Sequence, residues 1–182
     1  MRIGVLSDTH IHAVGSTHST CRSARPGPDP LAELERIIER HLNKVDRFIH
    51  LGDFTDPAVA RMLAKRAPLH AVCGNCDGPT LVRMFPEQQV VDIGGFRIGL
   101  HHGSGSPSGL CDRVSTRFDA SIDAVLFGHS HRALCEWRDG RLLLNPGSPT
   151  ERRSALIHTV ALLELGEQLE ARIIDVDDDR LR

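Results

Sequence analysis

Short apolar runs alternate with helical repeats along the first half of the chain. The runs at Arg2–Leu6, Arg47–Leu51 and His70–Cys73 have the length of buried strands. Between them, apolar residues recur at helical spacing from Leu31 to Leu42, and a second helix is expected at about Pro57–Arg66. Strands that alternate with helices predict a parallel sheet, in which ligands gather at the carboxyl ends of the strands.

The second half of the chain is β-rich, with turn signals between apolar runs. The signals are Gly94-Gly95, Asp139-Gly140 and Gly166-Glu167, which separate expected strands at 88–93 and 96–101, 132–138 and 141–144, and 155–165 and 168–176. A further strand is expected at 124–127 and a helix at 109–118. Together with the first half, this pattern predicts two facing sheets flanked by helices.

The chain has the size and composition of one globular domain over residues 1–182. Its 182 residues are 40% hydrophobic and 25% charged, as in ordinary folded proteins and unlike disordered ones. A stretch rich in Ser, Thr, Gly and Pro at about 11–30 predicts a long loop, and the acidic segment 175–179 predicts a frayed C-terminal tail.

Charge and hydropathy exclude several classes of partner. The formal net charge of −2 gives no overall basic field for bulk nucleic-acid binding. No apolar run approaches the roughly 18 residues of a membrane span, and the first run is shorter than a signal-peptide core, so we expect a cytoplasmic protein with no membrane contact. Five scattered cysteines fit a reducing compartment. The pattern leaves a homo-oligomer open.

The candidate chemistry lies where the expected strands end. These positions hold Asp8, His10, Asp53, Asn75, His102, His129 and His131. Mixed carboxylate, amide and imidazole ligands suit Mn, Fe, Zn, Co or Ni better than Mg or Ca, and the absence of thiolate from the set argues against a structural zinc site. Because seven ligands exceed what one ion uses, the set predicts two divalent ions that share a bridging carboxylate.

Some of these residues have competing interpretations. His101 and His102 compete for one ligand position, which the residue pattern alone leaves open. Cys73 and Cys76 form a CxxC motif, which also occurs in redox-active cysteine pairs. For Cys73, at the end of a buried strand, a packing role is favoured. His50 lies within a strand pattern, where a hydrogen-bonded structural histidine is more common than a ligand.

Five motifs, in this order, resemble those of the calcineurin-like metallophosphoesterase family. They are Asp8-Thr9-His10, Gly52-Asp53-Phe54-Thr55-Asp56, Gly74-Asn75-Cys76-Asp77, His102-Gly103 and Gly128-His129-Ser130-His131. Asn145-Pro146-Gly147-Ser148 also resembles a strand-end motif of the small bacterial and archaeal phosphodiesterases in this family. The resemblance implies a four-layer α/β/β/α sandwich of two mixed sheets flanked by helices.

The resemblance also implies a role for each residue of the set. Asp8, His10 and His131 would hold one metal ion, and Asn75, His102 and His129 the other, with Asp53 bridging the two. A hydroxide between the ions would attack phosphorus, which makes Asp53 and Asn75 catalytic as well as ligating. Asp56, Cys76 and Asp77 would surround the ligands without holding an ion, and Mn is the expected metal.

Cys76 decides the expected substrate class. Many family members have histidine after the motif asparagine, where an imidazolium assists the leaving group or contacts phosphate. A neutral thiol penalises monoester dianions more than diesters, so we expect a phosphodiesterase acting on a small phosphodiester or nucleotide-like substrate. The alternatives are a phosphomonoesterase or nucleotidase, and a noncatalytic scaffold subunit with the same fold.

Overall fold

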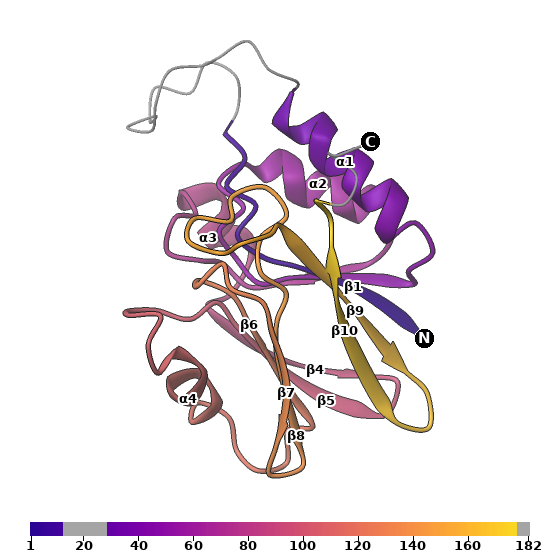
Figure 1. Cartoon of the computed structure of the whole chain (residues 1–182), viewed down its shortest axis with the longest axis vertical. Helices are drawn as coiled ribbons and strands as arrows, with labels where there is room; N and C mark the ends of the chain where they lie inside the picture. The colour runs from indigo at the N-terminus through magenta and orange to yellow at the C-terminus, as the bar shows by residue number, and fades with distance from the viewer. Residues whose placement is uncertain (13–28, 178–182) are drawn as a thin grey trace.

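A computed structural model describes residues 1–12 and 29–177 of the chain, which form two five-stranded sheets flanked by helices (Figure 1). The helices are α1 (Pro30–His41), α2 (Pro57–Arg66), α3 (Pro79–Met84) and α4 (Leu110–Ser115). The strands are β1 (Arg2–Leu6), β2 (Arg47–His50), β3 (Leu69–Ala71), β4 (Gln88–Ile93), β5 (Phe96–His101), β6 (Ala124–Phe127), β7 (Leu134–Arg138), β8 (Arg141–Asn145), β9 (Thr159–Leu165) and β10 (Leu169–Asp175). Within the described residues, no helix is long and apolar enough to cross a membrane.

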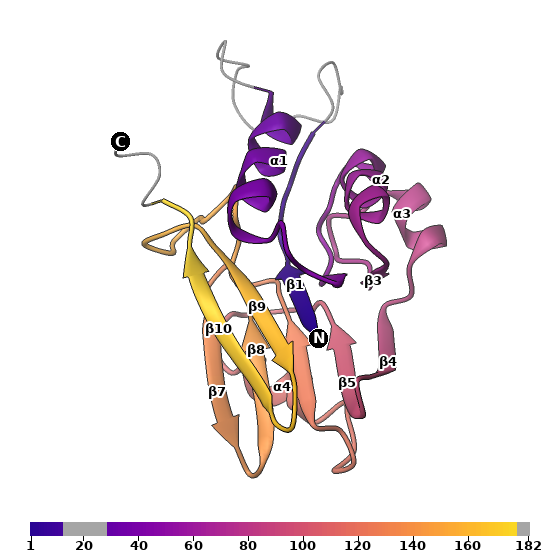
Figure 2. The same ribbon diagram turned by 90° about the vertical axis from the view of Figure 1, so that its right-hand side faces the viewer.

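Both sheets are mixed. The first has the order β10-β9-β1-β2-β3, with β1, β2 and β3 parallel and β9 and β10 antiparallel. The second has the order β4-β5-β6-β8-β7, with β5, β6 and β8 parallel and an antiparallel strand at each edge. In Figure 2, β9 and β10 of the first sheet lie over β7 and β8 of the second, and Cys135 Sγ donates to the Ala171 carbonyl at 3.6 Å across this side.

Successive side chains on each strand point to opposite faces of the sheet, so each sheet packs against the other sheet on one face and against helices on the other. On β1, Ile3 and Val5 point into the core between the sheets, whereas Leu6 packs with the helix α1 residue Ile38 on the outer face. On β6, Leu126 faces the other sheet and Val125 faces α4. Helices α1, α2 and α3 therefore lie outside the first sheet and α4 outside the second (Figure 1). The predicted four-layer α/β/β/α sandwich of two mixed sheets is confirmed.

Two of the predicted turns are two-residue hairpins. Gly94 and Gly95 have φ values of 60° and 87°, and Asp139 and Gly140 have 51° and 77°, so both residues of each turn are left-handed, as type I′ turns require. The third turn differs, because Leu165 pairs with Leu169 and three residues lie between them.

Several elements differ from the expected ones. Helix α3 was absent from the prediction, because its six residues are too few for a helical period to show. Helix α4 covers Leu110–Ser115 rather than 109–118, and β3 ends at Ala71 rather than Cys73. Strand β9 begins at Thr159 rather than at 155, so residues 146–158 form a loop. Most of the loop predicted at 11–30 and the end of the acidic tail lie outside the described residues, and the single-domain assignment stays a prediction.

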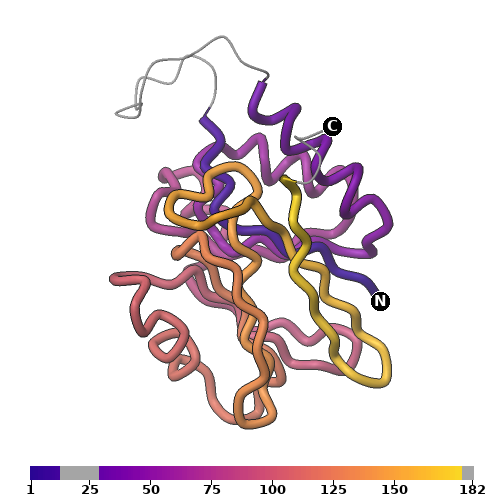
Figure 3. The backbone as a smooth tube through the Cα atoms, in the orientation of Figure 1, coloured from indigo at the N-terminus to yellow at the C-terminus, as the bar shows by residue number. Residues whose placement is uncertain are grey.

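The parallel strands of both sheets deliver their carboxyl ends to one edge of the sandwich. The chain leaves β1, β2 and β3 toward this edge in the first sheet, and β5, β6 and β8 in the second. In Figure 3, the orange loop after β8 passes beside the indigo segment after β1, and Ser148 Oγ donates to the Asp8 carbonyl at 2.7 Å there. All candidate ligands therefore lie on loops at the same edge.

Candidate metal centre

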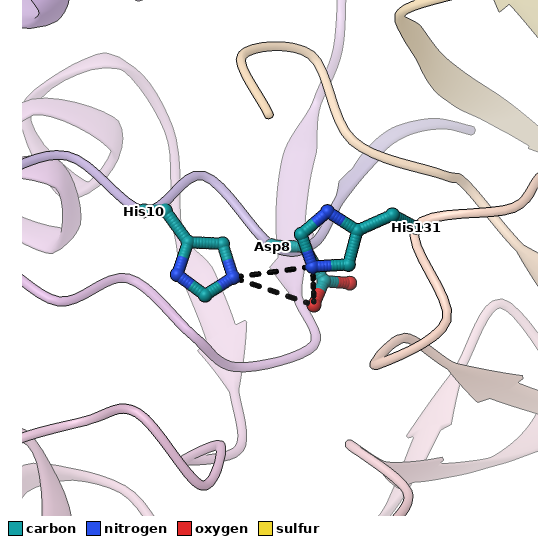
Figure 4. Close-up of side chains that lie close together, drawn as sticks. All are labelled: Asp8, His10 and His131. Atoms are coloured by element: carbon teal, nitrogen blue, oxygen red, sulfur yellow. Dashed lines mark hydrogen bonds and ion pairs between the residues drawn. The ribbon is translucent and has the colours of Figure 1, made fainter. Parts of the chain in front are cut away.

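Asp8, His10 and His131 converge at this edge, as Figure 4 shows. His131 Nε2 lies 3.3 Å from Asp8 Oδ1 and 3.2 Å from His10 Nε2. The two imidazole rings are stacked, with centroids 5.0 Å apart. Asp8 and His131 are buried, so these three side chains form a closed set of donors of the kind that holds a cation.

Asp53 links this set to a second one. Its Oδ2 lies 3.4 Å from His10 Nε2 and 3.3 Å from His102 Nε2. Asp8, Asp53 and His102 together form a second group of mutually close donors, so both carboxylates lie between the histidines. The position of Asp53 suits a carboxylate shared by two cations.

Asn75 and His129 complete the second set from the exposed side. His129 Nδ1 lies 2.9 Å from Asn75 Oδ1, and His129 Nε2 lies 2.8 Å from the Gly105 carbonyl. The rings of His129 and His102 meet edge to face, with centroids 5.3 Å apart. The structure thus brings all seven predicted ligands to one place.

Backbone carbonyls orient three of the four histidines. His102 Nδ1 donates to the Leu51 carbonyl at 2.6 Å, His129 Nε2 to Gly105, and His131 Nδ1 to Glu151. A carbonyl can only accept, so in neutral His102 and His131 the other nitrogen carries a lone pair that points into the site. Fixing the tautomer through the outer nitrogen is the usual arrangement around metal-binding histidines.

The backbone at these loops is held in an unusual conformation. Left-handed φ values between 44° and 70° occur at five of the seven candidate ligands: Asp8, His10, Asp53, His129 and His131. Asp and His tolerate this region better than most residues, but each costs on the order of 1–3 kcal/mol. In the loops after β1 and β6, the left-handed residues are pairs of ligands: Asp8 with His10, and His129 with His131. One residue lies between the two ligands of each pair, and this spacing aims both side chains at the site.

Two glycines permit a close approach of chain segments. A Cβ at Gly74 would lie 2.2 Å from Asp53 Oδ1, and one at Gly128 would lie 1.9 Å from Ser7 Oγ. Such separations are far below van der Waals contact, so any larger residue would displace the neighbouring ligand loop.

The electrostatics of the set favour ionised carboxylates. Burial raises the pKa of Asp53, but the adjacent His102 outweighs it and holds the pKa well below its usual range. Burial lowers the pKa of His102, yet Asp53 and Asp8 reverse the shift and raise it. Asp53 and His102 therefore favour each other's charged forms.

Asp77 and Asp56, two of the three residues predicted to surround the ligands, make different contacts. Asp77 accepts from the amides of Asp53, Gly74 and Thr55 at 3.0, 2.8 and 2.9 Å, so it fixes the Asp53 loop. Asp56 accepts from Ala58 N at 2.7 Å and caps α2, and within the described residues it has no hydrogen bond to a candidate ligand.

Cys76, predicted to surround the ligands without holding an ion, lies close to the donor atoms themselves. Its amide donates to Asp53 Oδ1 at 2.7 Å, and its thiol falls within 4.8 Å of donor atoms of His10 and Asp53. Burial and then the Asp53 charge raise the pKa of the thiol to about 12. The group is therefore a neutral thiol at pH 7 in the absence of a cation.

His101 and His102 occupy different positions relative to the donor cluster. His102 enters the cluster, whereas His101 Nδ1 accepts from Gly103 N at 2.7 Å and its side chain lines a neighbouring cavity of about 250 Å³. Asn75 and His102 also line this cavity, and Arg117 stands at its wall. The cavity therefore opens directly beside the candidate centre.

Several further residues support the ligand loops. Asn145, the last residue of β8 and the first of the motif noted in the sequence, donates from Nδ2 to the Gly128 carbonyl at 2.8 Å, and Thr150 Oγ1 in the loop after β8 donates to Thr9 O at 2.5 Å. His50 accepts from Gly52 N at 3.2 Å and lies 3.3 Å from Thr9 Oγ1, as expected of a hydrogen-bonded structural histidine. Arg153 Nη2 lies 3.4 Å from His10 Nε2, and no sequence signal distinguishes it from an ordinary loop arginine.

The donor set fits cations. Asp8 Oδ1 and His102 Nε2 are buried without a hydrogen-bond partner among the described residues, although each lies 4.0 Å or less from other donors of the set. Unpartnered buried polar atoms are rare and costly unless a ligand or ion completes them. Carboxylate, amide and imidazole donors are those of divalent transition metals.

Comparison with known proteins agrees with this geometry. The model of the calcineurin-like phosphoesterase superfamily domain matches residues 1–168. Proteins named "probable metallophosphoesterase" from Methanothermobacter thermautotrophicus and Methanocaldococcus jannaschii are each 32% identical, the first over 96% of this chain and 92% of its own length, the second over 98% and 83%.

Solved structures show the same fold. An archaeal phosphodiesterase superimposes with a TM-score of 0.70 and 26% identity, covering 97% of this chain and 100% of its own. Vacuolar protein sorting 29 (Vps29) from Cryptosporidium parvum gives a TM-score of 0.70 at 21% identity, over 97% and 92%. The convergence of seven metal-type donors at the strand ends thus occurs in a chain that belongs to the calcineurin-like phosphoesterase superfamily.

Proposed function

We propose that the protein is a phosphodiesterase that uses two divalent metal ions, with Mn as the best activator. The observation that carries this proposal is the seven-donor cluster with its unpartnered Asp8 Oδ1 and His102 Nε2. Asp8, His10 and His131 would hold one ion, Asn75, His102 and His129 the other, and Asp53 both. Bound cations of this kind activate water as a nucleophile and neutralise charge on phosphoryl oxygens.

The residues of this chain then have separate tasks. Asp77 fixes the amides around Asp53 and so sets the position of the shared carboxylate. The carbonyls of Leu51 and Glu151 keep His102 and His131 in one tautomer, with the inner nitrogen unprotonated. The cavity beside Asn75 offers room for an organic group of the ester.

Cys76 supports a diester rather than a monoester as substrate. A neutral thiol with a pKa raised to about 12 donates a proton poorly to a leaving group at pH 7. An aryl diester needs less protonation of its leaving group than an alkyl monoester. The archaeal phosphodiesterase with 26% identity over nearly the whole chain supports the same choice.

The second candidate is a protein-binding scaffold, because Vps29 structures share the fold. The complete donor set favours the enzyme, since a scaffold does not need every ligand. Purified protein stripped with a chelator and reloaded with Mn, Zn, Ni or Mg is assayed on an aryl phosphodiester and an aryl phosphomonoester. We expect Mn-dependent turnover that favours the diester; inactivity with every metal on both esters would support the scaffold.

A further inference from the structure

Arg153 brings a permanent positive charge to the edge of the candidate centre. Its Nη2 lies 3.4 Å from His10 Nε2, the same nitrogen that faces His131 and Asp53. Its Nε donates to the Glu151 carboxylate at 3.1 Å. The side chain is 47% exposed, so the guanidinium lies between the donor cluster and solvent.

The backbone of Arg153 adopts a conformation that costs free energy. The residue has a φ of 48°, a left-handed conformation that costs on the order of 1–3 kcal/mol outside glycine and concentrates at functional sites. Glu151 anchors the loop on both sides: its amide donates to Ser148 Oγ at 2.9 Å, and its carbonyl accepts from His131 Nδ1. The position of Arg153 is thus tied to a candidate ligand.

A cation on His10 would change what the guanidinium contacts. The lone pair of His10 Nε2 would then be occupied, and Arg153 would lose this acceptor. An arginine side chain carries five N–H donors and no acceptor, and Glu151 takes only one of them. The remaining donors face solvent, where water satisfies them, and a phosphoryl group that replaces this water matches the planar fork of a guanidinium.

We propose that Arg153 binds a non-bridging phosphoryl oxygen of the substrate and supplies the positive charge that residue 76 lacks. This inference rests on the proposed function in that the substrate is a phosphoester. A cysteine side chain has no cationic form, so the cationic group beside His10 on this side of the cluster is Arg153.

The test compares Arg153→Met and Arg153→Lys with Arg152→Met. Arg152 is exposed in the same loop and donates to the Leu156 carbonyl at 2.5 Å, which makes it the matched control. For each Mn-loaded protein, three quantities are measured: bound Mn per chain by elemental analysis, the Kd for inorganic phosphate by calorimetry, and kcat and KM for an aryl phosphodiester.

We expect Arg153→Met to keep its Mn and to bind phosphate about 10–100-fold more weakly, the range of one lost charge-assisted hydrogen bond. KM for the diester should rise by a similar factor, with a smaller fall in kcat. Arg153→Lys should be intermediate, because a point charge replaces the fork, and Arg152→Met should match the wild type.

Two results would overturn the inference. One is phosphate affinity in Arg153→Met within twofold of the wild type with Mn retained. The other is loss of Mn from Arg153→Met, which would assign the residue to the integrity of the metal centre. If the wild type hydrolyses no ester but binds phosphate in an Arg153-dependent manner, the catalytic proposal fails and the role of Arg153 stands.

Discussion

His10 Nε2 and His131 Nε2 lie 3.2 Å apart, although 121 residues separate the two histidines in the chain. The Glu151 carbonyl holds the other nitrogen of His131, so the lone pair of Nε2 points at His10. Asp8 Oδ1 lies 3.3 Å from the same atom and has no hydrogen-bond partner among the described residues. Such a concentration of acceptors is unfavourable alone and favourable around a cation.

Metal removal should therefore reduce both activity and stability. Chelated protein should lose hydrolysis of an aryl phosphodiester, and Mn should restore it more fully than Mg because imidazole ligands prefer the softer ion. At 100-fold excess over Kd, metal binding contributes about 2.7 kcal/mol, which raises Tm by roughly 5–10 °C for a chain of this length. Calorimetry and the diester assay measure both effects; equal activity of stripped and loaded protein would contradict the proposal.

Asp53→Ala should be the most damaging ligand substitution. Asp53 lies between both groups of donors, so its loss should release at least one metal ion and lower activity by more than the roughly 100-fold seen for residues that only support ligands. Elemental analysis and kcat/KM report the two effects. Asp92→Ala, an exposed carboxylate on β4, is the control and should change neither; matching metal loss in both variants would show that the site is misassigned.

Substitutions of Asp77 and Asp56 should affect metal affinity and stability differently, although both residues follow candidate ligands closely in the chain. Asp77→Ala removes two hydrogen bonds to the Asp53 loop and one to Gly74 N, so metal affinity should fall about 10–100-fold. Asp56→Ala removes the cap of α2, which should cost about 0.5–2 kcal/mol of stability and leave metal affinity unchanged. Metal titration and thermal unfolding of both variants separate the roles. Weaker metal binding in Asp56→Ala alone would favour the role expected from the sequence.

Cys76→His should shift activity toward monoesters. General-acid assistance is typically worth about 10²–10⁴-fold and matters most for poor leaving groups, so alkyl monoesters should gain and aryl diesters should gain little. The measurement is the ratio of monoester to diester kcat/KM, with metal content determined in parallel. The Cys76 thiol lies within 4.8 Å of donor atoms of His10 and Asp53, so the new imidazole could capture a metal. A flat or falling ratio with metal content unchanged would show that residue 76 does not set the preference.

Helix caps and turn residues, which are visible in the sequence, predicted where many of the helices and hairpins begin and end. Asp29 and Pro30 begin α1 as cap and first-turn residue, and the Asp29 carboxylate accepts from Leu31 N at 3.1 Å. Gly94-Gly95 forms the expected two-residue hairpin. Helix α3 has a first-turn proline, Pro79, but no side-chain cap, and its six residues are too few to establish a period. The packing of its buried Leu81 side chain in the core therefore decides this helix.

The sequence by itself determined the candidate donors, because short apolar strands that end in Asp and His place these side chains at the carboxyl edge of a sheet. It could not determine their relative positions. Asp8 follows a strand of the first sheet and His131 a strand of the second. The 3.3 Å distance between Asp8 Oδ1 and His131 Nε2 therefore depends on how the two sheets stack on a shared core. Arg153 shows the same limit: its charge is visible in the sequence, but its neighbour His10 is 143 residues away, and only the folded loop brings the two together.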